Sequence, residues 1–293
     1  MQPTPATTDD RERFIVTFAC PDQRGIVHRV SGLLASLGCN ITESQQYGDP
    51  YTKRFFMRVA ATAEERSPVI DDVRAGMASL AIDLGMVWDV HDASVRDRVL
   101  VLVSKQGHCL NDLLFRWRSG ALPVEIVAVA SNHPDLEPLA RANDVPFHHL
   151  PITPETRAEQ EAQILNLVHR ARVDLVVLAR YMQILSDDMC KRLEGRAINI
   201  HHSFLPGFKG AKPYHQAHER GVKLIGATAH YVTPDLDEGP IIEQEVARVD
   251  HTHTPEQLIA VGRDLENRAL ARAVQWHAER RILLNGARTV VFR

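Results

Sequence analysis

The order of hydrophobic and polar positions changes character near residue 95. Before it, residues 13–91 read as strand, helix, strand, strand, helix, strand. The stretch "RFIVTFAC" alternates as a half-buried strand does, whereas Ile26, Val30 and Leu34 recur at the spacing of one helical face. A ferredoxin-like βαββαβ arrangement fits this pattern, with both helices on one face of the sheet, and we predict it for residues 12–92.

Strands and helices alternate singly beyond a charged stretch at 91–98, which we interpret as a linker. The runs 98–104, 124–131 and 173–179 are continuously apolar, as in strands buried on both faces of a parallel sheet. Helices are expected between them, and a long one at 255–281. The pattern predicts an open, mostly parallel α/β sheet for the second domain, residues 97–293.

Composition excludes several classes of protein. The formal net charge of −3 over 293 residues favours neither nucleic acid nor an anionic membrane as a partner. No apolar run approaches the roughly 20 residues of a membrane helix, and the first residues lack the pattern of a secretory signal. Four cysteines without a CxxC pair indicate a cytoplasmic protein, and no HExxH occurs among the 15 histidines, so no metal site is predicted.

Polar side chains gather where the predicted strands end, which is where open α/β sheets bind ligands. In "INIHHSFLPGFKG" (198–210), Asn199 and His201 lie two apart and share one side of an extended segment, before a sharp turn at 205–207. Asp237 lies in a loop bounded by Pro and Gly. An amide, an imidazole and a carboxylate suit acyl transfer or hydrolysis, although a capping Asn, a loop His and a turn Asp explain the same residues. His202 is expected on the opposite face and dispensable.

These residues lie in motifs that resemble a known family. The runs "NIHHSFLP" and "HYVTPDLDEGP" are similar to the paired motifs of formyltransferases that use 10-formyltetrahydrofolate. The resemblance implies a Rossmann-like formyltransferase fold, and it places Asn199, His201 and Asp237 at the family's catalytic positions. The ending Asp-Glu-Gly-Pro departs slightly from the commoner Asp-Gly-Gly-Pro.

The resemblance also implies where the folate binds. The stretch "LARYMQILS" (178–186) resembles the loop that cradles the pteridine in this family. The folate-binding residues that it implies are Met182, Ile184, Leu185, Val232, Thr233 and Asp235. From the residues alone, without the resemblance, 182–185 read rather as the buried entry to a helix, although apolar walls with a few polar groups also suit a pteridine pocket.

The loop after the first strand of the second domain departs from the transferase pattern. Family members that formylate a phosphorylated amine carry Gly and Ser there, a composition that suits backbone binding of phosphate. Here Lys105, Gln106, His108 and Cys109 replace the small residues. We therefore expect water to be the acceptor of the formyl group. Cys109 suggests a nucleophile, but no base that would activate it is evident, and it is expected to pack in the core.

The first domain resembles the ACT domain, a small regulatory module that binds amino acids. The matching positions in "CPDQRGIVHRVSGLLASLGCNIT" are Asp22, Gly25, Asn40 and Ile41, with glycine or methionine as the implied effector. A dimerisation domain without a ligand is the alternative. Pairing of such domains implies a homo-oligomer, either a dimer or a tetramer.

An ACT domain ahead of this second domain is similar to the formyltetrahydrofolate deformylases. The implied reaction is hydrolysis of 10-formyltetrahydrofolate to tetrahydrofolate and formate, which supplies formate for purine biosynthesis. The folate is substrate, and no cofactor is expected. Formyl transfer to an amine is the alternative. A dinucleotide-dependent oxidoreductase is disfavoured because no GxGxxG motif follows a strand.

Overall fold

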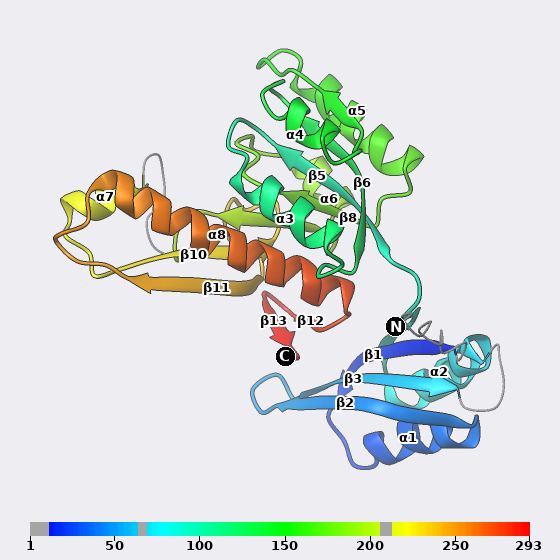
Figure 1. The fold of residues 1–293 in the computed structure, drawn as a ribbon. Helices are drawn as coiled ribbons and strands as arrows, with labels where there is room; N and C mark the ends of the chain where they lie inside the picture. Colours follow the sequence, from blue (N-terminus) through cyan, green and yellow to red (C-terminus); the bar gives the residue numbers. More distant parts are fainter. Residues whose placement is uncertain (1–11, 64–68, 206–212) are drawn as a thin grey trace, which may run out of the picture. The chain divides into compact units, whose positions relative to one another are not determined.

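A computed structural model describes residues 12–63, 69–205 and 213–293 of the chain. They divide into two compact units (Figure 1). The first unit holds the described residues up to Val95, together with Arg280–Leu283 and Val290–Arg293. The second holds Arg96–Glu279 and Leu284–Thr289.

The first unit is an antiparallel sheet with two helices, as the sequence predicts. Its elements are β1 (Arg13–Pro21), α1 (Ile26–Ser36), β2 (Cys39–Asp49), β3 (Arg54–Ala63), α2 (Ile70–Leu84) and β4 (Val87–Asp92). The strand order is β2-β3-β1-β4, because β1 pairs with both β3 and β4. Ile26, Val30 and Leu34 are buried in the core between α1 and the sheet, so the helical period in the sequence marks the buried face.

The last residues of the chain belong to this first unit, whereas the sequence placed them in the second. Leu283 and Phe292 form a small buried cluster with Ala19 and Phe56. Arg281 Nη1 donates to Glu43 Oε1 at 2.9 Å. The sequence could not reveal this grouping because nothing in "RTVVFR" specifies the sheet on which it packs.

The second unit contains a seven-stranded sheet. Its elements are β5 (Asp97–Val103), α3 (His108–Arg118), β6 (Val124–Ser131), α4 (Glu137–Arg141), β7 (Phe147–His149), α5 (Arg157–Arg170), β8 (Leu175–Leu178), α6 (Asp187–Arg192), β9 (Ala197–His201), α7 (Pro213–Glu219), β10 (Leu224–Tyr231), β11 (Ile241–Arg248) and α8 (Pro255–Ala278). A short pair, β12 (Ile282–Asn285) and β13 (Arg288–Val291), closes the chain.

The strand order β11-β10-β9-β8-β5-β6-β7 explains where a site can form. The strands from β9 to β7 in this order pair in parallel, and β10 and β11 add antiparallel edge pairs. From β5 the chain continues to β6 on one side and later to β8 on the other. Parallel connections that diverge from one strand leave a crevice at the carboxyl ends, and the loops after β5, β8 and β9 open into it.

The long helix α8 packs on β10, β11 and α3 (Figure 1). Its start is specified locally, since Thr254 and Gln257 form a reciprocal capping box and Pro255 occupies the first turn. The sequence did not predict α7 or β12. Residues 206–212, which include most of the predicted turn at 205–207, lie outside the described residues. Within the described chain, every helix is too short or too polar to cross a membrane.

Candidate active site

A cavity of about 250 Å³ lies at the carboxyl ends of β8 and β9. Leu178 pairs with Leu102 of β5 and with Asn199 of β9, so three strand ends meet there. The residues that follow β8, the end of β9 and the loop after β10 line the cavity. The sequence-predicted Asn199, His201 and Asp237 all line it. The alternation of a strand therefore does bring the amide and the imidazole to one side.

His201 and Asp237 form the central contact of the cavity. His201 Nδ1 lies 3.2 Å from Asp237 Oδ1, and the His201 residue is 6% exposed. Asp237 has a φ of 59°, in the left-handed region that few residues other than Gly, Asn and Asp adopt. The hydrogen bond from His201 holds the pKa of Asp237 below its ordinary value, against the opposing effect of burial. The carboxylate is therefore ionised and accepts from Nδ1–H.

The second ring nitrogen of His201 remains open. With Nδ1–H donated to the carboxylate, a neutral ring carries its lone pair on Nε2. Within the described part of the chain, the buried Nε2 atom has no hydrogen-bond partner. A buried acceptor without a partner is costly, so a water molecule or a substrate group is expected to meet it.

His230 orients Asn199, a contact that the sequence did not reveal. His230 Nδ1 lies 2.9 Å from the carbonyl oxygen of Tyr231, so Nδ1 donates and Nε2 accepts. Asn199 Nδ2 lies 3.2 Å from that Nε2 and donates to it. Burial lowers the pKa of His230, which keeps the ring neutral. One N–H of the Asn199 amide is thereby fixed, and the other is left for a ligand. The contact follows from the antiparallel register of β10 on β9, which pairs His230 with Asn199 and cannot be read from the sequence.

His202 departs from the sequence prediction. It was expected on the face opposite His201, but its ring stacks on that of His201 with centroids 4.9 Å apart, and it lines the same cavity. The strand ends at His201, so alternation no longer governs the next residue. Burial, followed by the charges of Arg180 and His201, lowers the pKa of His202 to about 4. A neutral His202 is therefore part of the cavity wall.

The predicted folate-binding residues separate into two groups. Met182, Ile184, Leu185, Val232 and Thr233 line the cavity, whereas Asp235 does not. Met182 and Ile184 are 57% and 60% exposed, so they are not the buried entry of a helix, but Leu185 is buried. Apolar side chains exposed at the mouth of a cavity are typical of a site for a flat, partly apolar ligand.

Buried polar groups hold the loop 180–186 in place through hydrogen bonds that no sequence pattern indicated. The backbone N–H of Met182 donates to Ser104 Oγ at 3.1 Å. Tyr181 donates to Gln160 Oε1 at 3.0 Å, and the N–H of Ser186 donates to Glu161 Oε1 at 2.8 Å. The loop that carries Met182 and Ile184 is thus held along its length.

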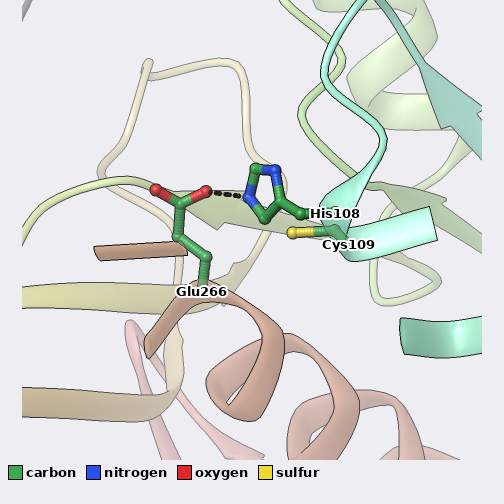
Figure 2. Close-up of side chains that lie close together, drawn as sticks. All are labelled: His108, Cys109 and Glu266. Carbon is green, nitrogen blue, oxygen red and sulfur yellow. Dashed lines mark hydrogen bonds and ion pairs between the residues drawn. The ribbon is translucent and has the colours of Figure 1, made fainter. Parts of the chain in front are cut away.

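The substituted loop after β5 forms a hydrogen-bonded cluster with α8 (Figure 2). His108 Nε2 lies 2.7 Å from Glu266 Oε2, and Tyr214 donates to Glu266 Oε1 at 2.9 Å. His108, Cys109 and Glu266 present possible metal ligands within 4.8 Å of one another. However, both Glu266 oxygens already accept hydrogen bonds, Arg180 lies 3.5 Å away, and burial raises the pKa of Cys109 well above its ordinary value. This donor set fits a buried hydrogen-bond network better than a cation. Cys109 is fully buried, as predicted.

Comparisons with known proteins agree with this architecture. The family model described as Formyl transferase matches residues 97–274, and the ACT domain model matches residues 14–75. A formyltetrahydrofolate deformylase from Corynebacterium sp. (strain P-1) is 50% identical over 284 residues, which cover 97% of this chain and 99% of the relative. The crystal structure of formyltetrahydrofolate deformylase from Burkholderia mallei is 55% identical, with a TM-score of 0.92 over 96% of this chain and 100% of that chain. The chain belongs to the formyltetrahydrofolate deformylase family.

A transformylase shares only part of this chain. The crystal structure of glycinamide ribonucleotide transformylase 1 from Symbiobacterium toebii is 34% identical, with a TM-score of 0.63, and covers 68% of this chain. Deformylases match at nearly full length because they include the ACT domain. The full-length match therefore favours the deformylase reading over the transferase alternative.

The predicted effector residues of the ACT domain are mostly on the surface of the first unit. Asp22, Gly25 and Asn40 are exposed, and Ile41 packs partly against the core. Gly25 has a φ of 87° where α1 begins, a conformation that favours glycine. The backbone at Gly25 is thus specified by the turn, and the binding of an effector there stays a prediction.

Proposed function

We propose that this chain hydrolyses 10-formyltetrahydrofolate to tetrahydrofolate and formate. The observation that supports it most directly is the meeting of an ionised Asp237, His201 and Asn199 in one cavity. The deformylase relatives support the choice of substrate. Water and the folate are the only reactants that the balanced reaction requires.

The first step adds water to the formyl carbon. Neutral His201 accepts a proton from water at Nε2 while the water oxygen bonds to the formyl carbon. The carbonyl π electrons move to the formyl oxygen, and the free N–H of Asn199 donates to the resulting oxyanion. Asp237, 3.2 Å from Nδ1, stabilises the imidazolium that forms.

The second step breaks the bond between the formyl carbon and N10. The oxyanion electrons re-form the carbonyl, and the imidazolium returns its proton, from Nε2, to the departing N10. Tetrahydrofolate and formic acid result, and formic acid loses a proton to solvent to give formate. His201 is neutral again after the second step, so the catalytic cycle is complete and its protons balance. The released formate would supply purine biosynthesis.

The test is incubation of the purified protein with 10-formyltetrahydrofolate and no amine. Formate and tetrahydrofolate are expected in equal amounts, at a rate that added glycinamide ribonucleotide does not increase. Consumption of the donor only when the amine is present would instead establish formyl transfer. A reaction without the protein serves as the control, and Asn199→Ala is expected to release formate about 10²–10³ times more slowly than the wild type.

We also propose that the ACT domain binds an amino acid, glycine or methionine, near Gly25 and Asn40. Both residues are exposed, which supports a site at the surface, but Gly25 precedes α1 and Asn40 follows it at the other end of the sheet, so a site that includes both is proposed to form between two copies of the domain. A rise in the unfolding temperature with one amino acid, lost in Asn40→Ala, is the expected result. The proposed dimer or tetramer is tested by sedimentation, in which a monomer would reject it.

A further inference from the structure

Arg180 occupies a backbone position that ordinarily calls for glycine. It lies two residues beyond the end of β8, with a φ of 64°. A side chain makes this left-handed conformation costly, and such strain persists where the surroundings over-determine it, often at functional sites. The Arg180 side chain is also buried, with 9% of its surface exposed. A buried charge in a strained backbone conformation destabilises the folded state, so the presence of an arginine here needs an explanation.

One side of the guanidinium is held firmly. Its Nε donates to Gln106 Oε1 at 3.2 Å and lies 3.5 Å from Glu266 Oε2. Glu266 is in turn fixed by His108 and Tyr214, and Figure 2 shows the His108 contact. Gln106 and His108 are two of the residues that replace the small residues of the phosphate-binding loop. The substituted loop therefore positions Arg180.

The other side of the guanidinium is unsatisfied. In the described part of the chain, the buried Nη1 atom of Arg180 has no hydrogen-bond partner. Arg180 lines the same cavity as Asn199, His201 and Asp237. The carboxylate of Asp237 is already engaged with His201, and His202 is neutral. Glu266 balances the charge of the guanidinium on its other side, so what this corner of the cavity lacks is a hydrogen-bond acceptor for Nη1, and a carboxylate oxygen is the strongest acceptor for a charged donor.

We propose that Arg180 binds the formate product and disfavours an amine as the acceptor. The inference rests on the proposed hydrolysis, in which formate is the anion that is made. One formate oxygen comes from the formyl group and the other from water, and a guanidinium is suited to a small carboxylate. A primary amine is mainly an ammonium ion at neutral pH, which has only hydrogen-bond donors and cannot accept from the unpartnered Nη1–H. The residue that receives the product thus also selects against a competing acceptor.

Product inhibition by sodium formate tests this site, with sodium chloride at equal ionic strength as the salt control. Formate is expected to inhibit the wild type, acetate to inhibit it less because of its methyl group, and methylammonium not at all. In Arg180→Gln the inhibition constant for formate should rise about tenfold or more, as for loss of a charged hydrogen bond. Arg180→Lys keeps the charge but not the planar fork, so its inhibition constant for formate should lie between those of the wild type and Arg180→Gln. Arg141→Gln, an exposed arginine on α4, should behave as wild type.

Direct binding keeps the test valid if a variant is inactive. Broadening of the resonance of ¹³C-formate is measured with each folded protein, and Arg180→Gln should abolish it. A wild type that formate neither inhibits nor binds, or an Arg180→Gln protein that binds formate as well as wild type, would overturn the inference. If the wild type releases no formate from the folate, the proposed function fails. If it does and Arg180 is irrelevant to formate, only this inference fails.

Discussion

Replacing Asp237 by Asn tests the pair that the proposed mechanism depends on most. The amide has the shape of the carboxylate but no charge. Asp237 has a φ of 59°, which Asn also tolerates, so the loop backbone should be retained. The change therefore removes the charge beside His201 without adding strain.

The size of the effect follows from the contact. His201 Nδ1 and Asp237 Oδ1 are 3.2 Å apart. Unit charges at that distance attract by about 5 kcal/mol at an effective dielectric constant of about 20, which is an upper limit for the imidazolium. At about 1.4 kcal/mol per tenfold change, this limit corresponds to roughly 10⁴-fold. We expect kcat to fall by about 10²–10⁴, the usual range for acid–base catalysis, with KM changed little.

The assay is the initial rate of formate release without an amine, alongside thermal unfolding. Asp144→Asn is a matched control, because Asp144 also has a φ of 59° but lies in the turn after α4 and pairs with exposed Arg118. The control should keep wild-type activity. An Asp237→Asn enzyme that keeps more than about a tenth of the wild-type kcat would refute the assigned role, since acid–base catalysis is worth more than that.

Three further predictions concern residues of the second unit. Asn199→Ala should lower kcat by about 10²–10³, as for removal of one oxyanion donor, and an unchanged rate of formate release would contradict the role of the amide. The pKa of His202 is about 4 in the folded chain and ordinarily 6.5, so the unfolded state binds the proton more tightly and stability falls as pH drops from about 6.5 to 4. His202→Gln should flatten that dependence, worth at most about 3 kcal/mol, in urea unfolding at each pH; an unchanged slope would argue against burial of a neutral ring. A Cβ at Gly239 would lie 1.7 Å from the carbonyl oxygen of Tyr231, so Gly239→Ala should cost about 3 kcal/mol or more of unfolding free energy, whereas Gly32→Ala, with open space around it, should not.

Hydrophobic periodicity predicted most of the strands and helices, because the burial of one face determines where these elements form. The run at 124–131 coincides with β6, and the mostly parallel sheet follows from alternation of strands and helices. The helix expected at 134–143 shrinks to Glu137–Arg141, and α7 was not predicted. Short helices depend on tertiary contacts that no local pattern records.

The site residues that belong to sequence motifs could be predicted, whereas those that only tertiary packing brings into the site could not. The paired motifs place Asn199, His201 and Asp237, and the strand alternation explains why two of them face one way. His230 was missed because its role comes from the register of β10 on β9. Arg180 was missed because an arginine after an apolar strand gives no sign of a positive φ. His202 was placed wrongly because the strand ends one residue before it.

The C-terminal residues that pack with Phe56 have a consequence for the order in which the chain matures. Leu283 and Phe292 follow most of the second unit along the chain, so the first unit acquires part of its apolar cluster only after most of the second unit has been synthesised. A fragment that stops after residue 95 would leave Phe56 without these two neighbours, and we expect it to aggregate. Deletion of residues 290–293 should likewise harm the first unit, most of which is synthesised before the second.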